Sequence, residues 1–152
     1  AEECAQYPSA FFLGCGINYP VALEGALKLK EVARIHAEAL PAAEMKHGPI
    51  ALIDDCMPVV FIAPVDASYE KIRLNLAEIT CRGGRTILLT TRETREPREP
   101  GKCVLIVPRP SCGELLPLLT VIPTQLLAYH AACAKNLQVD RPRNLAKTVT
   151  VE

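Results

Sequence analysis

The stretch AFFLGCGINYP, residues 10–20, indicates the fold of this 152-residue chain. Its first four residues are an apolar run, the next three form a glycine turn, and Pro20 suits the first turn of a helix. The helical pattern that follows is expected to run to about Leu40. A buried strand, a tight turn and a long helix together are typical of the opening unit of an α/β protein.

The same unit recurs along the chain. We expect further strands at 58–63, 85–90 and 103–107, and further helices at about 67–81 and 115–134. Pro123 lies inside the last helix and is expected to kink or divide it. Continuous apolar strands that alternate with helices predict a parallel sheet covered on both faces, which is the three-layer α/β/α class.

Length and composition predict one domain. The chain has 152 residues, of which 49% are hydrophobic, and this suits a single core. We expect that domain at 1–138, followed by an irregular tail at 139–152, because the last residues show no amphipathic helical period. Taken by itself, Lys147 in this tail is best explained as a solvated lysine on a frayed terminus.

The charge balance argues against two classes of partner. With 17 basic and 17 acidic residues the net charge is zero, so neither a nucleic acid nor an anionic membrane is expected. The acidic N-terminus opens no signal-peptide pattern, and no apolar run is expected to approach the roughly 20 residues that span a bilayer. These patterns predict a soluble, cytoplasmic protein.

The cysteine pattern predicts neither a disulfide framework nor a zinc site. There are seven cysteines, an odd number, and none form a Cys-x-x-Cys pair. We expect most of them to be small buried hydrophobes. Cys15 is the exception that we single out for a functional or redox role, because it lies in the glycine turn. That turn lacks the third glycine of the dinucleotide fingerprint, and no metal or other cofactor is predicted.

Three charged residues share one face of the first helix. Glu24, Lys28 and Glu31 are spaced i, i+4 and i+7, so their side chains leave the helix about one turn apart. Surface salt bridges have this spacing too, and they stabilise a helix by only about 0.2–0.5 kcal/mol. The sequence of these three residues alone does not decide between a surface ion pair and a site.

The flanks of this charged stripe favour a site. Val21 and Val32 border it on one side and Leu27 on the other, whereas Lys30 and Arg34 project elsewhere. An acid, a base and a second acid that are partly enclosed are suited to proton transfer. A histidine, His47, follows in the segment KHGP at 46–49.

Several motifs carry a resemblance that covers essentially the whole chain. They are LGCGINYP at 13–20, ALEGALKLKE at 22–31, HAEA at 36–39, EMKHGP at 44–49, QLLAYH at 125–130 and PRNLAK at 142–147. In these motifs the chain resembles the C-terminal sugar isomerase (SIS) subdomain of the isomerising glutamine–fructose-6-phosphate aminotransferases. The resemblance implies a parallel, flavodoxin-like sheet flanked by helices.

The resemblance also implies a reaction. In the family, fructose 6-phosphate is opened, its C2 carbonyl receives ammonia from glutamine, and a proton shift between C1 and C2 yields glucosamine 6-phosphate. By motif position, Glu31 is implied to be the base that moves the proton. Lys28 is implied to stabilise negative charge on the intermediate, while Glu24 holds Lys28 or assists the same network.

Two further segments receive roles from the resemblance. His47 matches a histidine that helps to open the sugar ring and is contributed across a subunit interface. Ala146 and Lys147 are implied to bind the substrate together with Glu31, and Lys147 to form an imine with the sugar carbonyl. This implied role replaces the solvated-lysine explanation of the tail.

The chain departs from the family pattern at three positions. Cys15 stands where arginine is usual and so removes a cation, and Arg141 stands where glutamine is usual. Ala43 stands where glycine is usual, and it would misplace the His47 segment if that position needs a positive φ. These changes affect the expected catalysis more than the expected architecture.

Half of the implied site is missing from the sequence. The family binds phosphate with a Ser/Thr-rich loop of the preceding SIS subdomain, for which 64–68 and 90–91 are poor substitutes here. The expected partners are therefore that preceding SIS domain, a glutaminase domain and a second copy in a homodimer, and we expect the chain alone to be inactive. Alternatives are a non-catalytic sugar-phosphate-binding or assembly module, and a phosphosugar isomerase without amination.

Overall fold

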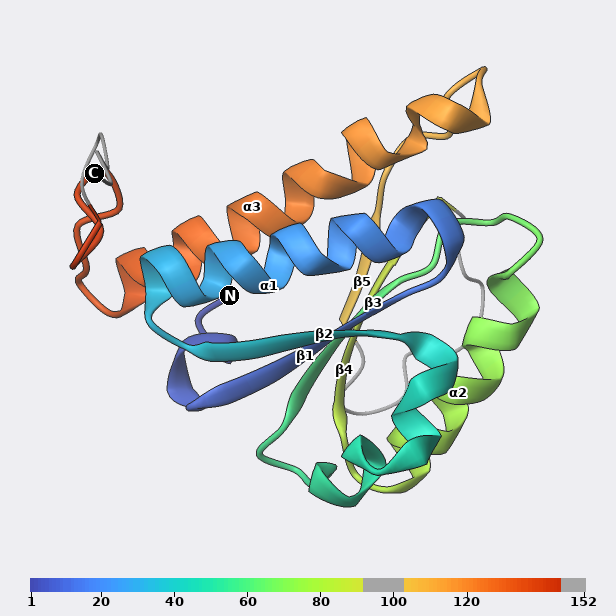
Figure 1. The fold of residues 1–152 in the computed structure, drawn as a ribbon, viewed down its shortest axis with the longest axis horizontal. Coiled ribbons are helices and arrows are strands. Elements are labelled where there is room, and N and C mark those ends of the chain that lie inside the picture. Colours follow the sequence, from blue (N-terminus) through green and yellow to red (C-terminus); the bar gives the residue numbers. More distant parts are fainter. Residues whose placement is uncertain (92–102, 146–152) are drawn as a thin grey trace, which may run out of the picture.

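A computed structural model describes residues 1–91 and 103–145, and its centre is one parallel sheet. The strands lie in the order β2-β1-β3-β4-β5, and each neighbouring pair is parallel (Figure 1). Their bounds are β1 Ser9–Gly14, β2 His36–Pro41, β3 Pro58–Ile62, β4 Arg85–Thr90 and β5 Cys103–Ile106. This is the flavodoxin-like order, so the predicted fold class is confirmed.

Helices cover both faces of the sheet. Helices α1 (Tyr19–Ala33) and α3 (Leu116–Ala134) lie side by side on one face, and α2 (Tyr69–Cys81) lies on the other (Figure 1). The short helices η3 (Ala42–His47) and η4 (Pro49–Leu52) join α2 on its face. Each face has its own cluster of buried hydrophobic residues, and strand β1 contributes side chains alternately to the two clusters.

The first helix is shorter than predicted, and a strand follows it. Helix α1 ends at Ala33, because Arg34 adopts the left-handed conformation (φ 53°, ψ 41°) and its N–H bonds to the carbonyl of Leu29. The next residues form β2, which pairs along its length with β1. Ala37 and neighbouring residues favour a helix by propensity, but pairing with the buried β1 overrides that weak preference. The prediction of a helix to Leu40 is therefore wrong.

Two glycines set the distance between α1 and the sheet. A Cβ at Gly14 would meet the carbonyl oxygen of Asn18 at 2.4 Å, and one at Gly25 would meet the ring of Phe12 at 2.7 Å. Each contact is too short for a real side chain, so only glycine allows this turn and this close helix packing. Pro20 lies in the first turn of α1 as predicted.

Helix α3 is one continuous helix despite Pro123. Together with the short turn before it, residues 113–134, it is long and apolar enough to cross a membrane by length and composition. The expectation that no apolar stretch would approach this length is thus wrong. Residues 113–134 contain only one Asp, Glu, Lys or Arg, which is Glu114. The helix buries Leu127, Ala128 and Ala131 beside α1, and core helices of soluble proteins meet the same criterion, so the indication is weak.

The cysteines lie mostly at the surface. Cys4 is buried and Cys15 is partly buried, whereas the other five are exposed, and all seven are free. The expectation that most would be buried is wrong. The exposed ones lie at element ends, in turns and on the outer side of α3, where core packing does not reach: Cys56, Cys81, Cys103, Cys112 and Cys133. Cys15 packs against the cluster on the α2 face, not against α1.

Candidate functional site

The charged stripe of α1 forms a connected group of side chains. Lys28 Nζ lies 2.7 Å from Glu31 Oε2, to which it donates a hydrogen bond, and 3.9 Å from Glu24 Oε1. The side chains of Glu24 and Lys28 are each 33% exposed and that of Glu31 is 27% exposed. The structure therefore brings together three of the predicted site residues in a partly enclosed row.

Packing of α1 explains this partial enclosure. One flank of the stripe is closed, because Val21 is buried and Val32 is partly buried against the sheet. The other flank is open, since Leu27 is exposed, as are Lys30 and Arg34 farther round the helix. The stripe thus lies at the border between the packed and the solvated sides of α1, where a ligand can reach it.

The hydrogen bond to Glu31 stabilises the protonated form of Lys28. It raises the pKa of the lysine, while partial burial acts in the opposite direction and the charges of both glutamates add to the increase. Lys28 is therefore a cation at neutral pH and remains one well into the alkaline range. A fixed cation next to a carboxylate can stabilise an oxyanion that forms when the carboxylate removes a proton.

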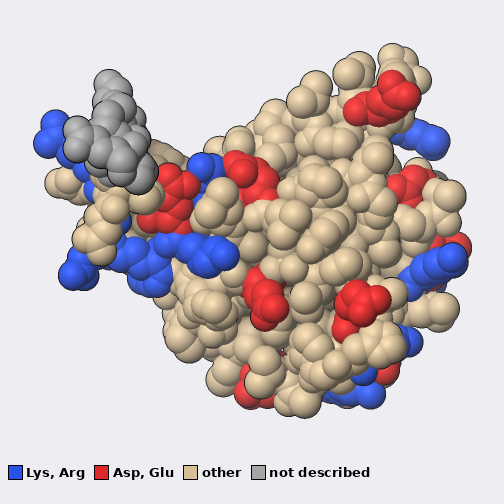
Figure 2. All heavy atoms as spheres, in the orientation of Figure 1, with Lys and Arg blue, Asp and Glu red and all other residues tan. Residues whose placement is uncertain are grey.

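Glu31 also lines a cavity beside the C-terminal segment. The cavity has a volume of about 630 Å³ and is lined by residues of the last turns of α1 and by Arg143, Asn144 and Leu145. Basic side chains gather next to this segment (Figure 2). The implied substrate residues Ala146 and Lys147 lie outside the described residues, which end one position before Ala146.

The location of this cavity differs from the usual rule for parallel sheets. Ligands in such folds bind at the carboxyl ends of strands, where the turn at 14–16 lies. Helix α1 runs back from that edge, so Glu31, near its last turn, lies toward the amino ends of the strands. Strand topology alone therefore predicts a site at the carboxyl edge of the sheet, whereas the charged stripe and the C-terminal segment lie toward the amino edge.

His47 is not near the stripe within one chain. It is exposed at the end of η3, which packs with α2, whereas α1 covers the opposite face of the sheet (Figure 1). The structure thus leaves the role of His47 a prediction. Ala43 is exposed and is not among the residues with positive φ, so alanine fits this position without strain.

The carboxyl edge of the sheet holds a second cavity that sequence reasoning missed. It measures about 580 Å³ and lies among residues that follow β1, β3, β4 and β5, including Ile17, Asp66, Thr91 and Arg109. Asp66 Oδ1 accepts hydrogen bonds from the backbone N–H and the hydroxyl of Ser68 at 2.7 and 2.6 Å. Asp66 Oδ2 accepts one at 3.3 Å from the buried Asn18.

Several polar groups of this edge bond to one another, whereas the buried Oδ1 of Asn18 has no hydrogen-bond partner among the described residues. Thr91 Oγ1 accepts a hydrogen bond from the N–H of Val65 at 3.0 Å, and the Asp66 carboxylate bonds to Ser68 directly before α2. An Asp two residues before Ser68 in the sequence is a signal for such a turn. The inference that 64–68 and 90–91 are poor substitutes for a phosphate loop stays a prediction.

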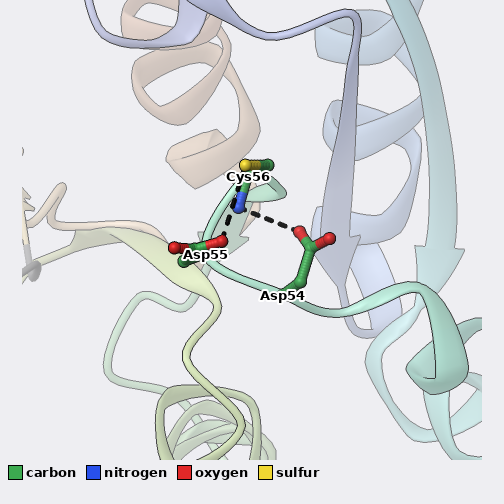
Figure 3. A group of neighbouring side chains, drawn as sticks. All are labelled: Asp54, Asp55 and Cys56. Carbon is green, nitrogen blue, oxygen red and sulfur yellow. Dashed lines mark hydrogen bonds between the residues drawn. The ribbon is translucent and has the colours of Figure 1, made fainter.

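One exposed cluster combines two carboxylates and a thiol. Asp54, Asp55 and Cys56 have ligand atoms within 4.8 Å of one another (Figure 3). The cluster is a turn in which Asp54 accepts a hydrogen bond from the Cys56 N–H at 2.9 Å. The hydrogen bond from the thiol to Asp55 raises the pKa of Cys56, which disfavours the thiolate that metals bind.

Comparison with known proteins identifies the class. The sequence model of the SIS domain family matches residues 4–135, and the chain belongs to this family. Over its full length the chain is 52% identical to the glutamine–fructose-6-phosphate aminotransferase [isomerizing] of Neisseria meningitidis serogroup A, and it is 57% identical over 144 residues to that of Chlorobaculum tepidum. The chain spans 25% and 23% of these relatives.

Solved structures agree with the sequence relatives. The C-terminal domain of glucosamine-fructose-6-phosphate aminotransferase from Francisella tularensis is 41% identical, with a TM-score of 0.85 over 92% of this chain and 39% of that chain. A tagatose-6-phosphate ketose/aldose isomerase described as putative, from Clostridium novyi, has a TM-score of 0.81 at 18% identity, which shows the fold alone. The likeness of this chain is to the C-terminal SIS region of the aminotransferases.

Proposed function

We propose that this chain is the isomerase half-site of a glutamine–fructose-6-phosphate aminotransferase, which converts fructose 6-phosphate to glucosamine 6-phosphate. The observation that carries the proposal is the Glu24–Lys28–Glu31 stripe beside a cavity. All 152 residues of this chain align with such an enzyme at 52% identity. The proposed location is the cytoplasm, where sugar phosphates of this class are metabolised.

The chemistry follows from the geometry of the row. Ammonia condenses with the C2 carbonyl of the opened sugar and water leaves. Glu31 then removes a proton from C1 and returns one to C2, and Lys28, 2.7 Å away, stabilises the negative charge that develops on the enolamine-like intermediate. Glu24 lies on the opposite side of Lys28 from Glu31 and attracts the ammonium group of Lys28, which keeps that group between the two carboxylates. In the proposed enzyme, Ala146 and Lys147 close over the sugar, and His47 of a second copy opens the ring.

Rows of exposed apolar side chains on α1 and α3 support the proposal that another domain docks on this chain. Leu23 and Leu27 on α1, and Leu118, Ile122 and Leu126 on α3, are 47–64% exposed. Figure 2 shows that the face over these two helices is mostly uncharged. Large apolar side chains gathered in rows are typical of a docking surface. We propose that the preceding SIS domain, which supplies the phosphate loop, docks on these outer rows of α1 and α3.

A hybrid enzyme tests the proposal. The matching C-terminal residues of the N. meningitidis enzyme are replaced by this chain, and glucosamine 6-phosphate formation from fructose 6-phosphate and glutamine is measured. We expect activity, and we expect Glu31→Gln to lower kcat by about 100-fold or more, since a positioned acid–base group contributes that much. Glu70→Gln on the exposed surface of α2 is the matched control. Equal rates for Glu31→Gln and the unchanged hybrid would exclude Glu31 as the base.

A second candidate function is a non-catalytic assembly module. The observation that favours it is the Asp66 carboxylate at the carboxyl edge, which is bonded to Asn18 and Ser68 and whose negative charge opposes an incoming phosphate. A folded hybrid that binds glucosamine 6-phosphate in calorimetry but forms no product would support this alternative. Tight binding by the 152-residue chain alone would contradict our proposal that most phosphate contacts lie in the preceding domain.

A further inference from the structure

The segment that carries His47 is attached to the body of the protein at two points. Ala42 and Met45 are buried in the cluster that also contains Ile72 and Ile79 of α2. His47 itself is exposed two residues after Met45. The buried residues hold η3 against α2, but they leave the orientation of its last residues to contacts made nearer the surface.

Lys46 makes such a contact directly before His47. Its Nζ lies 3.0 Å from Glu78 Oε2 on α2, and the other carboxylate oxygen of Glu78 lies 3.2 Å from Arg82 Nη2. Arg82 also donates a hydrogen bond at 3.1 Å to the backbone carbonyl of Glu78. Arg82 therefore holds the Glu78 carboxylate in place, and Glu78 holds Lys46.

The chain on either side of His47 is held by different contacts. Gly48 has φ 138° and ψ −55°, a backbone conformation that residues other than glycine rarely adopt, and η4 begins at the next residue. The Gly48 carbonyl accepts a hydrogen bond from the Ala51 N–H at 2.9 Å, which anchors the chain after His47. An exposed ion pair adds little to global stability. This one ties Lys46, the residue directly before His47, to α2.

We propose that Glu78 is a positioning residue for His47, which it orients through its ion pair with Lys46. The proposal rests on the proposed function, because it assumes that His47 acts on the sugar of a second copy. In that setting a small displacement of the His47 ring slows ring opening while the other substrate contacts remain.

The test compares single and double variants of the hybrid enzyme. Glu78→Gln is expected to lower kcat about tenfold and to change KM less than twofold, since only the orientation of His47 is affected. Glu70→Gln, which breaks an ion pair with Arg73 on the same helix, is the control and should leave kcat unchanged. In a His47→Asn background, Glu78→Gln should cause no further loss, because its effect passes through His47.

A measurement without catalysis completes the test. The ring signal of His47 in the NMR spectrum of the 152-residue chain, assigned with His47→Asn, should shift or broaden in Glu78→Gln and not in Glu70→Gln. Lys46→Met removes the other partner of the ion pair, which is more exposed than Glu78. This variant should reproduce the lower kcat and the changed His47 signal, even if Glu78→Gln fails to fold.

The two proposals fail in different ways. If His47→Asn leaves kcat unchanged, the proposed role of His47 is wrong, whatever Glu78 does. If His47→Asn lowers kcat but Glu78→Gln is silent, or adds its full loss in the His47→Asn background, the positioning role of Glu78 is overturned. An unchanged His47 signal in both Glu78→Gln and Lys46→Met would overturn it as well.

Discussion

At the scale of single residues, partial burial sets the properties of the Glu24–Lys28–Glu31 stripe. Lys28 has two carboxylate partners on its own helix, and the closed flank at Val21 and Val32 keeps part of the row from water. The pair of Lys28 with Glu31 therefore combines modest stabilisation with a defined charge at neutral pH. Its contribution depends on pH in a direction that its pKa determines.

We expect Lys28→Met to lower the free energy of unfolding by about 0.5 kcal/mol at neutral pH, because screening by water limits a pair that is one third exposed. The pKa of Lys28 is raised in the folded chain by Glu31. The stabilisation is thus complete below the ordinary pKa of lysine, and it is lost as the pH rises through the raised value. Urea unfolding across this alkaline range measures it.

Lys30→Met is the control for this prediction, since Lys30 forms no ion pair within the described part of the chain. The difference between the two variants should disappear at strongly alkaline pH. A difference that stays constant from neutral to alkaline pH would show that lost packing of the lysine stem, and not its charge, explains the effect.

At the scale of elements, strands β1, β3, β4 and β5 and helices α2 and α3 were predictable from local pattern, whereas β2, the short helices and the end of α1 were not. The strand 85–90 and the helix ending at Cys81 agree with the structure, because apolar runs and the glycines after them mark their bounds. The α1–β2 junction has no glycine or proline signal. Its stop is made by Arg34 in a conformation that arginine rarely adopts.

We expect Arg34→Gly to raise the free energy of unfolding by about 0.5–1 kcal/mol, because glycine adopts the left-handed conformation without a steric penalty. Lys30→Gly, one turn earlier in the helix interior, is the matched control and should lower it by about 1 kcal/mol. Urea unfolding of both variants measures the two effects. A loss of stability in Arg34→Gly would mean that the arginine side chain makes contacts that outweigh its backbone strain.

The candidate site was predictable to a similar, partial extent. Spacing alone placed Glu24, Lys28 and Glu31 on one face, and the structure joins them. The Asn18–Asp66 hydrogen bond and the Lys46–Glu78 ion pair join segments that are far apart in the sequence, and such contacts depend on the packing of the whole fold. The roles of Ala146 and Lys147 stay predictions, since these residues lie outside the described part.

At the scale of the whole molecule, the distribution of apolar side chains indicates where another domain fits. The outer rows of α1 and α3 are exposed, while their inner sides form the core of that face. Helix α3 is apolar on nearly all sides, which is typical of a helix that is buried from two directions. This explains why its composition resembles that of a membrane span.

We expect the double variant Leu23→Lys and Leu126→Lys to abolish activity of the hybrid enzyme, because charges on the outer rows oppose docking of the preceding domain. Both side chains are about half exposed in this chain, so its own melting temperature should change little. Leu74→Lys on α2, an exposed residue on the opposite face, is the control. Full activity of the double variant would place the docking surface elsewhere.

Strand β2 leads to one more consequence. It carries the chain from the end of α1 to η3, so Glu31 and His47 lie on opposite faces of the sheet, although only one short strand separates them in sequence. Under the proposed function each catalytic centre is then shared, with one acid and one imidazole from different copies. Two defective chains can consequently repair each other: mixed hybrids carrying Glu31→Gln and His47→Asn, each inactive alone, should regain about a quarter of the full activity after dissociation and reassociation. Ultracentrifugation and the product assay together measure this complementation, and mixtures that stay inactive although they exchange subunits would show that each copy works with its own histidine.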